Sequence, residues 1–227
     1  GPIFVRDAAG TVAAVKFGFN AWGNRWHPHA DDALLPDRIA ALLGMRLFKA
    51  PVVLEGGAIF VDGQGTLITT EQCLLNPNRN PDLSREEIEQ GLRDYLGVTT
   101  IVWLPVGHVL DTGPAGTDGH VDGVAQYLAP GRVLLEAPSD PTADAYDGGQ
   151  ANLAVVRGAI DARGRAIDVV GMDPGSDPGV SYANHYIANG AVIVPTGGDA
   201  PDADGHDGED GDERMLAFLA TVYPGRE

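Results

Sequence analysis

The sequence predicts an α/β fold made of repeated units. Strand-forming runs meet at tight turns whose glycines, Gly65, Gly131 and Gly190, lie 66 and 59 residues apart. Amphipathic helix patterns fall between these hairpins, and a strand pattern follows each of the first two helices. A hairpin, a helix and a strand therefore recur about every 60 residues. Because one such unit cannot bury its own faces, we expect the units to form a closed or stacked array.

The three predicted hairpins cover residues 58–69, 124–135 and 185–194. Each joins two apolar runs through a turn that contains glycine, with Asn or Pro before it in the last two. Such residues suit the backbone of tight β-turns, so antiparallel pairing is expected in all three segments.

The first helix has the strongest boundary signals. Ser84 and Glu87 form a capping box, in which each side chain reaches the other residue's backbone N–H. The apolar residues behind it share one helical face, and Gly97 is placed to end the helix. These residues are Ile88, Leu92, Tyr95 and Leu96.

Two further helices and two strands complete the pattern. The second helix is expected over residues 142–162, and the third over residues 213–222. Strands are expected at 100–104 and 167–170. The inward-facing residues of the two helices are predicted to be Leu153, Val156 and Ile160, and Met215, Leu216, Leu219 and Val222.

Composition limits the possible functions. The 227 residues contain 15 basic and 32 acidic side chains, which gives a net charge of −17, and 44% are apolar. That apolar content is typical of a folded chain, and the charge disfavours nucleic acid and anionic membranes. A cationic ligand or simple surface solvation remains possible. With one cysteine and no membrane-spanning run, the sequence indicates a cytoplasmic protein without disulfides.

Both ends of the chain are abrupt. Gly1 and Pro2 lead directly into a strand-like run, without Met. The last residues, Pro224 to Glu227, follow a helix pattern and resemble the start of another segment. We therefore expect residues 1–227 to be one domain truncated at both ends.

Residues 199–213 are rich in acidic side chains. A calcium-binding loop would need glycine at its sixth position, but counting from Asp202 places His206 fifth and Asp207 sixth. The mismatch favours a solvated acidic surface loop.

His120 is the histidine whose surroundings most resemble a site. It lies in Thr117–Gly123, at the predicted front of a strand, where His120 and Asp122 would project from the same face. A histidine beside a carboxylate can act as a general acid and base. The alternative is a turn with a polar strand edge.

Other candidates are less specific when taken singly. Glu55 ends an apolar run and precedes two glycines, so it is either an acid in a cleft or a capping residue. Trp22 is either a binding wall or a core residue. His27 and His29 lack a second cluster at metal-binding spacing, so no metal or other cofactor is expected. Cys73, in apolar surroundings, is expected to be a buried structural thiol.

Five sequence blocks are more specific in combination. They are Phe19–Gly23, Leu54–Gly57, Leu67–Pro81, Gly119–Asp122 and Ser181–Gly190. In this order they resemble the agmatine deiminase family, which includes bacterial peptidyl-arginine deiminases, over almost the whole chain. The resemblance implies a five-bladed α/β propeller, the pentein fold, of which this chain would hold about three and a half units.

The resemblance also implies an activity. Family members deiminate a guanidinium group through a covalent cysteine intermediate, and agmatine gives N-carbamoylputrescine and ammonia in polyamine synthesis. By residue, His120 matches the general acid and base, Asp122 a guanidinium-binding carboxylate, Glu55 a third acid near both, and Trp22 a wall of the substrate pocket. The expected partner is a small cationic guanidinium compound, and a homo-oligomer is possible.

Two family residues have no counterpart in this chain. The nucleophilic cysteine would follow Pro224–Arg226, and a second guanidinium-binding Asp would precede Gly1. Cys73 matches a different family cysteine. The fragment alone is therefore expected to be inactive. Two alternatives stay open for the whole protein: a peptidyl-arginine deiminase, or a non-catalytic relative that binds a cationic ligand.

Overall fold

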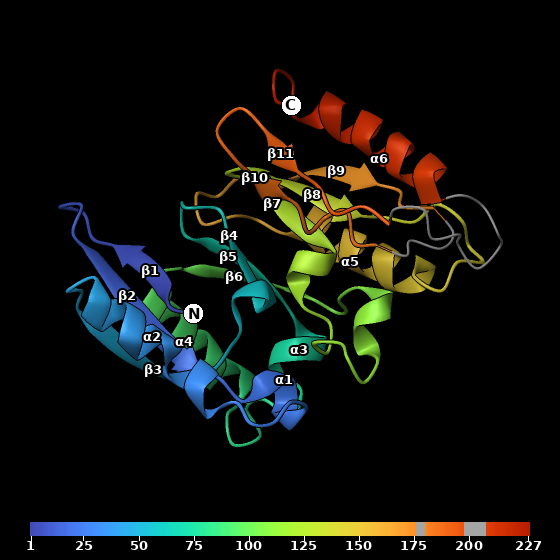
Figure 1. The fold of residues 1–227 in the computed structure, drawn as a ribbon. Coiled ribbons are helices and arrows are strands. Elements are labelled where there is room, and N and C mark those ends of the chain that lie inside the picture. The colour runs from blue at the N-terminus through green and yellow to red at the C-terminus, as the bar shows by residue number, and fades with distance from the viewer. Residues whose placement is uncertain (176–179, 198–207) are drawn as a thin grey trace.

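The computed structural model describes residues 1–175, 180–197 and 208–227. Three units of three strands follow one another across the molecule, and a two-stranded hairpin comes after them (Figure 1). In each three-stranded unit the first two strands pair antiparallel, and the third pairs parallel to the second. The predicted repeat of hairpin, helix and strand is therefore confirmed.

The first unit begins with a hairpin that the sequence patterns did not identify. Its turn runs through Asp7, whose carboxylate accepts N–H bonds from Ala9 and Thr11, and through Gly10 at φ +88°. The elements are β1 (Ile3–Arg6), β2 (Val12–Gly18), α1 (Ala21–Asn24), α2 (Ala30–Leu42) and β3 (Leu47–Val53).

The second unit agrees with the sequence predictions. The capping box of Ser84 and Glu87 is present, and Gly97 ends the helix at φ +69°. The elements are η1 (Gly56–Ala58), β4 (Ile59–Val61), β5 (Thr66–Thr70), α3 (Glu71–Leu74), α4 (Arg85–Leu96) and β6 (Thr100–Leu104).

The third unit has a shorter helix than predicted. Helix α5 does not extend over 142–162, because Ile160 leaves it to form a bridge with Ala166 and is 52% exposed. Leu153 and Val156 are buried as expected. The elements are η2 (Val109–Thr112), η3 (Val121–Gly123), β7 (Ala125–Ala129), β8 (Arg132–Glu136), α5 (Tyr146–Gly158) and β9 (Asp168–Met172).

The last part consists of β10 (Tyr186–Ile187), β11 (Val192–Ile193) and α6 (Gly208–Val222). Helix α6 begins before the predicted residue 213, so the acidic stretch is not a loop throughout. Its residues 199–207 lie outside the described ones. Met215 and Leu219 are buried, but the expected inward position of Leu216 is wrong, since it is 44% exposed.

The hydrophobic cores lie between consecutive units. Helix α4 of the second unit packs against β3 of the first, and α5 of the third packs against β6 of the second. A third cluster joins β8 and β9 to α6. Each unit therefore buries its apolar surface against its neighbour, as expected for stacked repeats. Among the helices that the structure describes, none has the length and apolar character to cross a bilayer.

Candidate active site

The four residues that the sequence singles out line one cavity of about 500 Å³. Trp22 comes from α1, and Glu55 directly follows β3. His120 and Asp122 come from the η3 turn in front of β7. Residues far apart in the chain are thus brought together where the first three units meet.

His120 and Asp122 do not lie on a strand, contrary to the sequence prediction. His120 precedes the 3-10 turn η3, which is closed by the Val124 N–H donating to the Val121 carbonyl, and strand β7 starts only at Ala125. The two side chains still approach each other, with 3.9 Å between His120 Nδ1 and Asp122 Oδ1.

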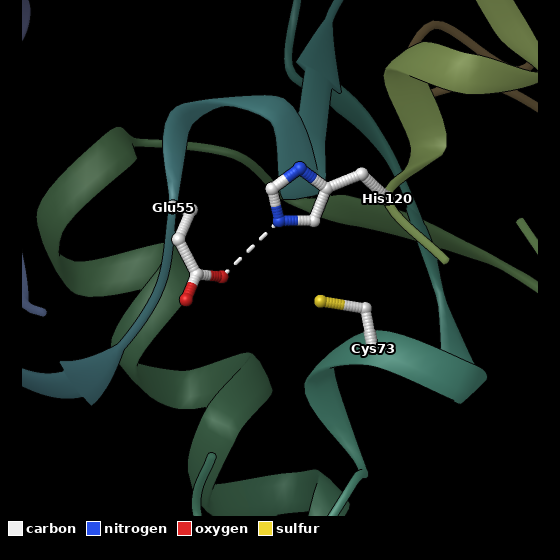
Figure 2. A group of neighbouring side chains, drawn as sticks. All are labelled: Glu55, Cys73 and His120. Atoms are coloured by element: carbon white, nitrogen blue, oxygen red, sulfur yellow. Dashed lines mark hydrogen bonds and ion pairs between the residues drawn. The ribbon is translucent and has the colours of Figure 1, made fainter. Parts of the chain in front are cut away.

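Glu55 and His120 form a buried pair. The distance between His120 Nε2 and Glu55 Oε2 is 3.3 Å, and the two side chains are 8% and 6% exposed. Figure 2 shows them pointing toward each other, with the sulfur of Cys73 directed into the same space. Glu55 makes no capping bond to η1, so the capping alternative does not describe it. The carboxylate is placed to orient the imidazole.

Arg79 holds the other side of Glu55. Its Nε donates to Glu55 Oε1 at 2.8 Å, and its Nη1 donates to Asp118 Oδ2 at 2.8 Å. The Arg79 side chain is fully buried. Arg25 also ion-pairs with Asp118. Buried charges persist when they are paired and hydrogen-bonded, so this network gives the site a rigid base.

The loop in front of His120 is organised by Asp111. Its carboxylate accepts N–H bonds from Thr117 at 2.7 Å and from His120 at 2.9 Å. Burial alone would raise the pKa of Asp111, but these bonds and the Thr117 hydroxyl lower it overall. Asp111 therefore sets the backbone position from which the imidazole projects.

Gly57 allows the close approach of these groups. A Cβ at this position would lie 2.3 Å from Asp122 Oδ2 and 2.6 Å from His120 Nδ1. Real Cβ atoms do not come so near to other atoms, so any larger residue at this position would force the Asp122 and His120 side chains to move. The two glycines after Glu55 thus have different surroundings, because nothing lies within 4 Å of a Cβ at Gly56.

Trp22 is held in an unusual turn. Ala21, Trp22 and Asn24 have φ values of 54°, 54° and 62°, in the left-handed region that non-glycine residues seldom adopt. Asn20 supports the turn, since its Oδ1 accepts from the Gly23 N–H at 3.0 Å and its Nδ2 donates to the Asn78 carbonyl at 2.8 Å. Conformational strain at a cavity wall is typical of functional positions.

Glu55, Cys73 and His120 offer ligand atoms that lie within 4.8 Å of one another. A metal would have to separate the His120 ring from Glu55, which lies 3.3 Å away, and deprotonate the fully buried thiol of Cys73. Arg79 also occupies the Glu55 carboxylate. The group therefore fits a metal poorly, and the absence of a metal cofactor stays a prediction. Burial raises the pKa of the Cys73 thiol to about 12, which favours the structural role expected from the sequence.

Asp122 is the most accessible acid of the group, with its side chain 25% exposed. Burial raises the pKa of Asp122, and His120 opposes that effect. A cation entering the cavity would compensate for the desolvation of this carboxylate. Two acids and a histidine around one cavity can hold a planar cation and transfer a proton to or from it.

Arg79, Asp118, Asp111 and Asp32, the last of which also lines the cavity, were not identified from the sequence as site residues. Arg79 and Asp118 both lie within motifs quoted above, yet their ion pair joins loops 39 residues apart. The position of these charged residues inside motifs that resemble the family is the signal that could have indicated Arg79 and Asp118. Asp32 offers no such signal, because acids in the first turn of a helix are common.

Comparison with known proteins gives consistent results. A model of the Porphyromonas-type peptidyl-arginine deiminase family matches residues 1–227. The agmatine deiminase of Pseudomonas fluorescens is 41% identical over 257 residues, with 100% of this chain and 66% of the relative covered. That of Pseudomonas aeruginosa is 39% identical with the same coverage. The chain spans between 62% and 66% of the length of these and other curated relatives, less than two-thirds.

Solved structures extend the likeness to the fold. The structure of Enterococcus faecalis agmatine deiminase catalysing its reaction has a TM-score of 0.84 and 33% identity, with 100% of this chain and 66% of that chain covered. A C. jejuni agmatine deiminase variant with substrate bound has a TM-score of 0.80 and 25% identity, with 100% and 64% covered. The predicted α/β pentein fold is confirmed, and this chain forms about two-thirds of it.

Proposed function

The chain belongs to the Porphyromonas-type peptidyl-arginine deiminase family, and from this premise we propose that the full-length protein hydrolyses agmatine to N-carbamoylputrescine and ammonia. The observation that carries the proposal is the single cavity lined by Trp22, Glu55, His120 and Asp122. Relatives that are 39% and 41% identical are named agmatine deiminases, which favours this substrate.

Binding is the first task of the proposed site. A guanidinium group is planar and cationic, and carboxylates that accept its paired N–H bonds hold it best. Asp122 takes this role, because it is the more accessible acid and forms no ion pair with a Lys or Arg among the described residues. Glu55, already paired with Arg79, acts mainly by orienting His120.

The chemical steps require a thiolate that attacks the guanidinium carbon. A C–S bond forms, His120 gives a proton to the leaving nitrogen, and the C–N bond breaks to release ammonia. His120 then accepts a proton from water as its oxygen attacks the same carbon. The C–S bond breaks, and the ureido product leaves while the thiolate is restored. In this proposal the nucleophilic cysteine and a second guanidinium-binding Asp lie outside residues 1–227.

Two other functions compete with this proposal. A peptidyl-arginine deiminase would use the same acid and base groups and differ at the far end of the substrate. A non-catalytic relative would bind a cation without turnover, but the presence of His120, Asp122 and Glu55 in one cavity favours an enzyme.

The decisive assay measures ammonia and ureido product from the full-length protein with agmatine and with arginyl peptides. The His120→Ala variant should lose about 10²–10⁴-fold in kcat. His27→Ala, which removes an exposed histidine that lines neither the cavity nor the neighbouring one around His120, serves as the control and should keep activity within about threefold. Absence of product from both substrates, or full activity of His120→Ala, would contradict the proposal.

The wider role follows from the product. N-carbamoylputrescine formation would place the protein in putrescine synthesis, in the cytoplasm. A homo-oligomer also belongs to the proposal, and light scattering on the full-length protein would test it. The net charge of −17 suits a cationic substrate and disfavours binding to nucleic acid.

A further inference from the structure

The cavity has a second acidic component that the proposed chemistry does not use. Asp32, in the first turn of helix α2, lines it together with Leu35 and Pro36 of the same helix. The acid and base residues come from other elements, the loop after β3 and the η3 turn. The cavity is therefore acidic at two separate places in the fold.

Asp32 differs from the other acids of α2 in its contacts. Asp31 ion-pairs with Arg38 at 2.7 Å, and Asp37 ion-pairs with Lys16 and Lys49. The Asp32 carboxylate has no hydrogen bond or ion pair with any of the residues that the structure describes. It is thus the acid of this helix whose charge is left for a ligand.

Apolar side chains complete the lining of the cavity. An aromatic wall is formed by Phe17, Phe19 and Trp22. The rings of Phe19 and Trp22 meet edge to face, with 5.1 Å between their centroids. Such a surface packs well against methylene groups. A ligand that matches the whole cavity is a cation at each end of a short apolar chain.

Agmatine has this chemistry, because an alkyl chain separates its guanidinium from an ammonium group. In a peptide, the same end of the arginine side chain continues into uncharged backbone. We infer that Asp32 binds the ammonium end of agmatine, and that it makes the site prefer a free amine to a peptide. This inference rests on the proposed function, since it assumes that the guanidinium lies near His120 and Asp122.

The test compares agmatine with butylguanidine, which lacks the terminal amine, as ligands of the full-length protein. In Asp32→Asn, the KM for agmatine should rise about tenfold while kcat changes little, and the kinetics with butylguanidine should stay the same. Asp31→Asn is the matched control. It makes the same charge change in the same helical turn, but at a residue paired with Arg38. It should leave KM and kcat unchanged for both agmatine and butylguanidine.

Salt dependence provides a readout that a structural role would not change. The KM of the unaltered protein for agmatine should rise with ionic strength, and this dependence should be weaker in Asp32→Asn. An equal effect of Asp32→Asn on both substrates, or no effect on either, would overturn the inference.

Calorimetry separates a failure of this inference from a failure of the proposed function. If agmatine binds but is not hydrolysed, the proposed function is wrong, and the ratio of agmatine to butylguanidine affinity still tests Asp32. A ratio that falls about tenfold in Asp32→Asn supports its role, and an unchanged ratio refutes it. If neither compound binds to the unaltered protein, both ideas are wrong.

Discussion

Two buried histidine–glutamate pairs occur in the described part of the molecule, and they differ in their surroundings. His120 and Glu55 lie 3.3 Å apart beside the cavity of about 500 Å³. His108 and Glu136 lie 3.6 Å apart beside a smaller cavity of about 230 Å³. All four side chains are less than 10% exposed.

The two pairs differ in whether a cationic side chain lies beside the glutamate. Glu55 has Arg79 at 2.8 Å, whereas no Lys or Arg among the described residues pairs with Glu136. Glu136 Oε2 and His108 Nε2 have no hydrogen-bond partner. Burial raises the pKa of Glu136 to about 8, and Asp173 adds to the effect. Burial also lowers the pKa of His108, although Asp111 opposes this.

The comparison shows that the same two residue types have different electrostatic properties in different surroundings. With Arg79 beside it, a buried glutamate can remain a carboxylate and orient an imidazole. Without a cation, burial favours the uncharged forms of both groups. The first pair borders the larger cavity and has a cation beside its carboxyl group, whereas in the second pair burial shifts the pKa of each group toward its uncharged form.

Removing the cation should have the largest effect. The Arg79→Met variant leaves Glu55 buried without a positive partner, and its stability should fall by about 3–5 kcal/mol. Arg38→Met is the control, since the Arg38–Asp31 pair is 62% and 85% exposed and should contribute less than about 1 kcal/mol. Urea unfolding of the full-length protein measures both, and equal stabilities would contradict the role of Arg79.

Glu136→Gln should change how stability depends on pH. Below about pH 4.5, Glu136 is protonated in both the folded and the unfolded state. Between about 4.5 and 8, the unfolded chain loses this proton while the folded protein keeps it, so stability falls as pH rises. The variant lacks this loss, so its free energy of unfolding should exceed that of the unaltered protein by on the order of 4 kcal/mol at about pH 8.

Urea unfolding at about pH 5 and about pH 8 tests this expectation. The lowered pKa of His108 acts in the opposite direction, because stability falls as pH drops from the ordinary histidine pKa of 6.5 toward the lower pKa of His108 in the folded state. His108 is present in both proteins, so the difference between them reports Glu136 together with its contact to His108. A difference that is the same at the two pH values would refute the raised pKa.

A smaller effect is expected from moving the His120 ring without removing a charge. In Gly57→Ala, the new methyl group collides with Asp122 and His120, and kcat/KM for agmatine should fall about hundredfold. Gly56→Ala is the adjacent control, with nothing near its Cβ, and should remain close to the unaltered protein. Equal activities of the two variants would show that the ring position is not constrained as described.

Local signals in the sequence were sufficient for much of the fold. The capping box at Ser84 and the glycines at 65, 131 and 190, all with positive φ, depend on residues within one turn. The hairpin of β1 and β2 was missed because its two turn residues, Asp7 and Gly10, are separated by two alanines. The sequence pattern placed Ile160 in a helix because its spacing from Leu153 and Val156 fits one helical face. In the structure the helix ends at Gly158, and Ile160 pairs with Ala166.

The candidate site was predictable only as separate motifs. Glu55, His120, Asp122 and Trp22 could be named from their local blocks, and they do share a cavity. Arg79 could not be connected to Glu55 and Asp118, because that network depends on how two units dock. The free carboxylate of Asp32 is likewise visible only when the pairs of Asp31 and Asp37 are seen.

The placement of the cavity between units bears on how such proteins evolve. Glu55 follows the last strand of one unit, Arg79 lies within the next, and His120 lies in the third, in front of strand β7. A gene segment that encodes one unit therefore carries a scaffold but no complete site, and its duplication adds framework without adding activity. New chemistry in this architecture arises by substitution in the connecting loops, while the repeated strands and helices can be inherited unchanged.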